Sequence, residues 1–94
     1  MSLIPVPTLD FYRRDDCDLC DEARLALQAV MEDRARRGMP NPRVRYVNVS
    51  GRPDLEERYG ARVPVIAVGA EEISLVTSGR AIAVFLDRVM GQLV

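Results

Sequence analysis

The 94-residue chain has no histidine and only two cysteines. One chain therefore supplies only two of the soft ligands that a zinc site uses, and a complete metal site would need a second chain, carboxylates or an outside thiol. No apolar run is long enough to span a membrane. The net charge of −1 also lacks the basic field that nucleic acid requires. These absences argue against a self-contained metal site, a membrane partner and a nucleic-acid partner.

Targeting signals, internal repeats and low-complexity segments are also missing. Residues 1–7 have no cationic start, no sustained apolar run and no small-residue cleavage pattern, so we expect no signal peptide and a cytoplasmic protein. The length suits one domain over residues 1–94 with a single modest core, and we expect a monomer. In the cytosol thiols stay reduced, so a Cys-x-x-Cys pair more often indicates redox chemistry than a structural disulfide.

Hydrophobic spacing and turn residues predict the element order βαβαββα. Strands are predicted over 8–12, 44–49, 65–68 and 73–76. Helices are predicted over 18–37, over 54–59 and from just after Gly79 through Leu93. The strand–helix–strand order predicts a right-handed parallel crossover. The turn at 69–72 predicts that the last two strands are antiparallel neighbours.

Two helix ends carry further signals. Ser78 or Thr77 can cap the last helix, which has apolar residues at intervals of three and four. Arg34, Arg36 and Arg37 gather near the end of the first helix. They are most simply a solvated terminus that complements the helix dipole, and the alternative is a site for a specific anionic partner.

Cys17 and Cys20 lie at the predicted turn from the first strand into the first helix. Residues three apart on a helix have Cβ atoms about 5 to 6 Å apart, so a small adjustment of the first turn allows a disulfide. At the helix start, free backbone N–H groups and the dipole stabilise a Cys17 thiolate. Cys20, one turn further and beneath Leu19, should be less exposed. We therefore assign Cys17 as nucleophile and Cys20 as resolving cysteine.

Charges around Cys17 act in opposite directions. Arg13 and Arg14 favour its thiolate, whereas five acids oppose it: Asp15, Asp16, Asp18, Asp21 and Glu22. The dipole is worth about 0.3 to 1 kcal/mol, and one pKa unit corresponds to about 1.36 kcal/mol. We therefore expect the pKa of Cys17 to be modestly lowered at best. A structural disulfide, half of a metal site and two inert small side chains remain alternatives for the pair.

The element order, together with Cys17-Asp18-Leu19-Cys20, Arg62-Val63-Pro64-Val65 and Ser78-Gly79, resembles the thioredoxin fold. The chain is most similar to the glutaredoxins and the small bacterial glutaredoxin-like proteins, over nearly its whole length. The resemblance implies an α/β, thioredoxin-like domain in which a mixed four-stranded sheet is flanked by three helices.

The resemblance also implies binding residues. It implies a cis Val63–Pro64 bond beside the dithiol, where the Val63 backbone can pair with a peptide or with glutathione. It places the γ-glutamyl carboxylate of glutathione at Ser78 and Gly79, and it sets Arg14 at the position of a family lysine. The chain departs from the family pattern between the cysteines, where Asp18-Leu19 replaces proline and an aromatic residue, and after the helix-start glycine, where Arg80-Ala81 replaces an acidic residue.

Three functions follow from these patterns. The first is a thiol–disulfide oxidoreductase without a metal or a tightly bound cofactor, for which glutathione can serve as co-substrate. Its partners would be a disulfide-bearing protein or glutathione disulfide, and a cellular reductant. The second is an iron–sulfur or metal carrier whose cysteines are shared between chains. The third is a non-catalytic thioredoxin-fold binding module.

Overall fold

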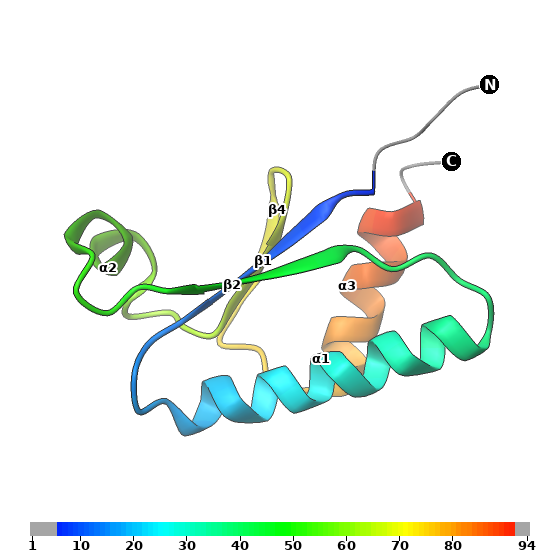
Figure 1. Ribbon diagram of the computed structural model, residues 1–94, viewed down its shortest axis with the longest axis horizontal. Helices are drawn as coiled ribbons and strands as arrows, with labels where there is room; N and C mark the ends of the chain where they lie inside the picture. Colours follow the sequence, from blue (N-terminus) through cyan, green and yellow to red (C-terminus); the bar gives the residue numbers. More distant parts are fainter. Residues whose placement is uncertain (1–5, 92–94) are drawn as a thin grey trace.

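The computed structural model describes residues 6–91 and has the predicted order of elements (Figure 1). The elements are β1 (Thr8–Arg13), α1 (Asp18–Arg36), β2 (Arg43–Asn48), α2 (Pro53–Tyr59), β3 (Val65–Val68), β4 (Glu71–Ser74) and α3 (Gly79–Gly91). The strands form one sheet in the order β2-β1-β3-β4. β1 and β2 are parallel, whereas β3 is antiparallel to both β1 and β4. The predicted thioredoxin-like architecture is confirmed.

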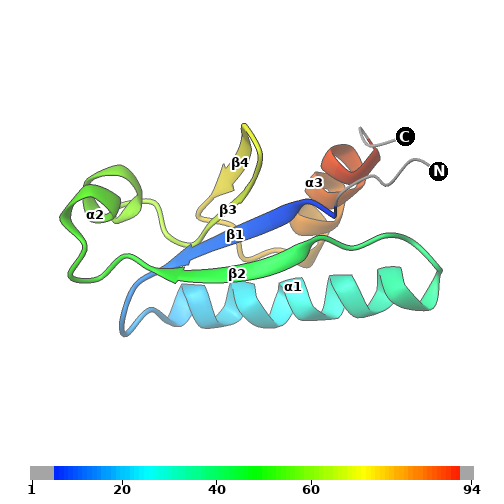
Figure 2. The same cartoon turned by 45° about the horizontal axis from the view of Figure 1, so that its top comes forward.

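The core lies between the sheet and the two longer helices. α1 and α3 pack against each other, and α2 lies at the end of the sheet where β1 and β2 finish (Figures 1 and 2). Leu9 and Phe11 alternate along β1 with more exposed residues and are fully buried, as strand geometry requires when one face covers a core. Ile82 and Leu86 come from the predicted apolar face of α3 and are also fully buried. Within residues 6–91, no helix has both the length and the apolar character needed to cross a membrane.

The β3–β4 hairpin is tighter than predicted. Its turn consists of Gly69 and Ala70 alone, and β4 begins two residues earlier than expected. Gly69 has φ +60°, a conformation that two-residue hairpin turns require. β4 ends at Ser74 because Leu75 adopts φ +54° and donates its N–H to the Arg62 carbonyl. The predictions for residues 1–5 and for Leu93 lie outside the described residues.

The cluster of arginines at the end of α1 is not uniformly solvated. Arg36 and Arg37 are exposed as predicted, but the interpretation is wrong for Arg34, whose side chain is only 2% exposed. Arg34 donates Nη1 to Asp87 Oδ1 at 2.6 Å and both Nε and Nη2 to the Pro40 carbonyl, at 3.1 and 2.8 Å. It thereby joins α1 to α3 and to the loop before β2. A linear pattern could not reveal this, since Asp87 is 53 residues away.

Candidate functional site

The two cysteines lie where β1 passes into α1. The chain turns after Arg13, with Asp16 in the left-handed region at φ +52°, and Cys17 is the extended residue that caps α1. Cys17 and Cys20 are joined by a disulfide, with their Cα atoms 5.2 Å apart. The backbone N–H of Cys20 also donates to Cys17 Sγ at 3.1 Å. The sulfur of Cys17 therefore occupies the capping position that a side-chain oxygen usually fills.

The two sulfur-bearing residues differ in exposure. Cys17 is partly exposed, whereas Cys20 is fully buried and belongs to the core cluster. Cys20 is less exposed than Cys17, as expected, and Leu19 is 51% exposed. Cys20 is buried because it shares a helix face with Ala23 and Leu27, both of which belong to the same core cluster. Only Cys17 is thus available to a partner from solution.

The two arginines before Cys17 are each paired with an acid. Arg13 donates Nη1 to Asp21 Oδ1 at 3.0 Å, and the N–H of Asp21 donates to the Cys17 carbonyl at 3.1 Å. The Arg13–Asp21 pair therefore lies on the first turn of α1. Arg14 extends toward α2, where it donates to the Gly60 carbonyl at 3.2 Å and lies 3.6 Å from a carboxylate oxygen of α2. The first pair partly cancels one of the acidic charges that oppose a Cys17 thiolate.

The loop that carries Cys17 is held by the connection between β2 and α2. The Asp15 N–H donates to Ser50 Oγ at 2.9 Å, and Asn48 Nδ2 donates to Asp15 Oδ1 at 2.7 Å. The Ser50 N–H in turn donates to Asn48 Oδ1 at 2.9 Å. Sequence reasoning missed Asn48 and Ser50. The sequence did carry a signal for them, because both are polar and lie at the carboxyl end of the predicted second strand. That strand was predicted to run parallel to the strand before the cysteines, and the carboxyl ends of two adjacent parallel strands lie at the same edge of the sheet.

Val63 and Pro64 lie at the same end of the sheet as the cysteines. The peptide bond between them is cis, the isomer that the resemblance implies, and both residues are buried. β3 starts directly after Pro64 and pairs antiparallel with β1, with Val65 opposite Tyr12. The Val63–Pro64 segment therefore lies beside the stretch of chain that leads from β1 to Cys17.

Ser78 and Gly79 lie elsewhere. Ser78 caps α3 as predicted, accepting a hydrogen bond from the Ala81 N–H at 3.3 Å. A Cβ placed on Gly79 would lie 3.9 Å from Val30 Cγ2. Val30 is twelve residues after the first residue of α1, or about 18 Å along the helix axis. The structure thus brings Arg14, Val63 and Pro64 to the end of the sheet that holds the cysteines, but it places Ser78 and Gly79 beside the middle of α1 (Figure 1).

Potential metal ligands do not gather at the site. Although acids surround Cys17, no group of three or more histidine, cysteine, aspartate or glutamate side chains within residues 6–91 is arranged to hold a metal ion.

The mixed four-stranded sheet, its helices and a cysteine pair at the first strand–helix junction define a glutaredoxin-like protein of thioredoxin fold. The family model described as glutaredoxin-like domain (DUF836) matches residues 8–88, and the chain belongs to this family.

Two solved structures of one bacterial protein are similar to this chain. The X-ray structure of XcR50 from X. campestris, a Northeast Structural Genomics target, is 29% identical with a TM-score of 0.69 over 85% of this chain and 96% of that one. The solution structure of XcR50 is 31% identical with a TM-score of 0.64 over 85% and 92% of the two chains. A comparison with curated proteins finds no match.

Proposed function

We propose that the protein is a cytoplasmic dithiol–disulfide oxidoreductase in which Cys17 is the nucleophile and Cys20 the resolving cysteine. The Cys17 thiolate attacks one sulfur of a target disulfide, and the other target sulfur leaves as a thiolate. Cys20 then loses its proton to water and attacks Cys17 Sγ, which releases the second target thiolate and forms the Cys17–Cys20 disulfide. Two electrons pass from the protein to the target, and two cellular thiols, which become a disulfide, return them.

The difference in exposure between the two paired cysteines is the observation that carries this proposal. A target can reach Cys17, which is partly exposed, but not Cys20, which is fully buried. The Cys20 N–H that donates to Cys17 Sγ supports the same assignment. After reduction this donor can stabilise a Cys17 thiolate, because a hydrogen bond to the charged form of a group favours that form.

The segment before Pro64 supports a binding role for the backbone. Neither the N–H nor the C=O of Val63 has a backbone hydrogen-bond partner among residues 6–91. An extended target chain beside Cys17 could pair with these groups as an added strand does. In the glutathione-coupled form of the proposal, Arg14 holds a carboxylate of the tripeptide. Gly79 lies beside Val30, and this position does not support a role for Ser78 and Gly79 in binding glutathione.

Thiol trapping with single-cysteine variants tests the proposal. The reduced full-length protein is mixed with a small peptide disulfide, quenched with an alkylating reagent and weighed by mass spectrometry. The unchanged protein should finish as the internal disulfide with both peptide thiols released. Cys20→Ser should stop at one mixed disulfide per chain, because its resolving thiol is missing, and Cys17→Ser should form neither product.

Other results would contradict this assignment of roles. A mixed disulfide that forms as fast with Cys17→Ser as with the unchanged protein would show that Cys17 is not the nucleophile. A coloured dimer in freshly purified protein that needs both cysteines and does not react with disulfides would support the metal or iron–sulfur carrier instead. Unchanged function of Cys17→Ser in the cell would support a binding module with idle cysteines.

A further inference from the structure

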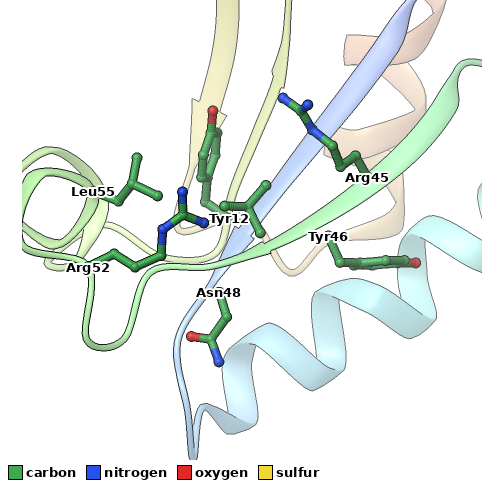
Figure 3. Close-up of a pocket in the computed structure, with 7 residues that line it drawn as sticks. Tyr12, Arg45, Tyr46, Asn48, Arg52 and Leu55 are labelled. Carbon is green, nitrogen blue, oxygen red and sulfur yellow. The ribbon is translucent and has the colours of Figure 1, made fainter.

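A hollow of about 440 Å³ opens beside α2, at the end of the sheet where β1 and β2 finish. It lies on the sheet face that points away from the core, because Tyr12 alternates with the buried Phe11 and pairs with Val47 of β2. Figure 3 shows Tyr12 standing between two arginines, Arg45 and Arg52. The volume is within the range of small-molecule sites. In open α/β sheets, ligands often bind beyond the carboxyl ends of neighbouring strands.

Two arginines and no acidic residue line the hollow. Arg45 donates Nε to Asp10 Oδ1 at 2.7 Å, and this hydrogen bond raises the pKa of Arg45. Its two terminal nitrogens have no partner within residues 6–91, and in the same part of the chain the Arg52 guanidinium makes no hydrogen bond or ion pair. Both arginines therefore keep donors free for an anion.

Two aliphatic side chains and the Tyr12 ring give the hollow part of its lining. Val47 and Leu55 are partly buried, and the ring of Tyr12 is held in place by stacking on Tyr59, with ring centroids 3.8 Å apart and planes 14° apart. Burial, together with the neighbouring Tyr59 side chain, raises the pKa of Tyr12 to about 12. Its hydroxyl therefore stays protonated at neutral pH and adds no negative charge that would repel an anion.

We propose that this hollow binds a small organic anion whose flat apolar body lies over Val47, Leu55 and the Tyr12 ring, and whose phosphate or carboxylate is held by Arg45 and Arg52. Guanidinium groups bind both kinds of anion with two parallel hydrogen bonds. Binding of such an anion requires neither glutathione nor a protein disulfide. The proposal therefore does not depend on the thiol chemistry described above.

One side chain separates the hollow from the cysteine loop. Asn48 lines the hollow, but its amide nitrogen donates to Asp15 and its amide oxygen accepts from Ser50. Figure 3 shows Asn48 pointing away from the side on which Tyr12 and the two arginines stand. A ligand in the hollow would therefore be recognised without contact with Cys17, and binding should persist when Cys17 is replaced by serine.

Nuclear magnetic resonance titration of the full-length protein at low salt tests the proposal. The probes are phenyl phosphate, benzoate and inorganic phosphate, so that the first two compare the two anions and the third lacks the apolar body. Phenyl phosphate or benzoate should shift the amide signals of residues 45–48, 52 and 55 in a saturable way, with a millimolar or lower Kd. Inorganic phosphate should bind about tenfold more weakly, equivalent to about 1.4 kcal/mol.

Matched arginine variants decide whether the hollow is responsible. Arg52→Gln should weaken binding of the tighter aromatic anion about tenfold. Arg43→Gln should leave it unchanged, because Arg43 is also exposed, lies on β2 and does not line the hollow. The proposal is overturned by the absence of saturable shifts, by equal losses in the two variants, or by inorganic phosphate binding as tightly as the aromatic anions. Cys17→Ser should bind as the unchanged protein does, so a failure of the oxidoreductase proposal would leave this result standing.

Discussion

Replacing Arg34 by methionine should destabilise the protein, although Arg34 lies far from the cysteines in the chain. Methionine keeps an unbranched apolar stem, so the replacement removes the guanidinium and its hydrogen bonds with little loss of packing. In the structure, that guanidinium donates twice to the Pro40 carbonyl and once to Asp87 Oδ1. The expected loss of stability therefore comes from these polar contacts.

The two contacts should contribute unequally. Hydrogen bonds from a charged donor are worth about 1.5 to 3 kcal/mol, and we count the two bonds to the single Pro40 carbonyl as one. Asp87 is 59% exposed, so water can replace Arg34 there, and an ion pair of this kind is worth about 0.2 to 1 kcal/mol. The replacement also removes the cost of burying the Arg34 charge, which offsets part of these two contributions. The net loss in the free energy of unfolding is then about 2 kcal/mol. A domain of this size should then melt about 10 °C lower.

Urea unfolding followed by circular dichroism measures this loss, with the cysteines kept reduced in every sample. Arg36→Met is the matched control, because Arg36 is 70% exposed on the same turn and its replacement should change the free energy of unfolding by less than about 0.5 kcal/mol. Asp87→Asn should cost less than about 1 kcal/mol. A loss below about 0.5 kcal/mol for Arg34→Met, or an equal loss for Asp87→Asn, would refute the assignment of most of the energy to the Pro40 carbonyl.

Two further predictions concern a tyrosine and an ion pair. Burial, together with its stacked neighbour Tyr59, raises the pKa of Tyr12 from 10.0 to about 12. The unfolded chain therefore ionises first, and the free energy of unfolding should fall as the pH rises from about 10 to about 12. Tyr12→Phe should flatten this fall in urea unfolding while Tyr46→Phe keeps it, and identical pH profiles would contradict the prediction. Arg13→Gln should slow alkylation of reduced Cys17 by iodoacetamide, because it removes a positive charge from the first turn of α1. Asp21→Asn should speed this alkylation about threefold, because charges four residues apart on a helix lie about 6 Å apart and interact by about 0.7 kcal/mol in a water-like dielectric. The double variant should return near the original rate, and a change of the same sign in both single variants would refute this coupling.

Local patterns were sufficient to predict the order and type of the elements in residues 6–91. Apolar spacing along α3 identified Ile82, Phe85 and Leu86 as core residues, and all three are buried. The cysteine pairing was also predictable, because two residues three apart at the start of a helix are close by backbone geometry alone. The family resemblance then depended on motifs that could be seen in the chain itself, such as Val63-Pro64-Val65. The chemical roles of Cys17 and the segment at Val63 stay predictions.

The sequence by itself therefore determined what neighbouring residues do to one another: helix faces, turns, caps and the spacing of the two sulfurs. Only the tertiary structure decided which distant groups meet. It buried Arg34 against a loop and a second helix, tied Asn48 to the loop before Cys17, and set Gly79 beside Val30. The physical reason is that backbone geometry constrains residues a few positions apart, whereas the burial and partners of a side chain depend on the elements that the fold packs against it.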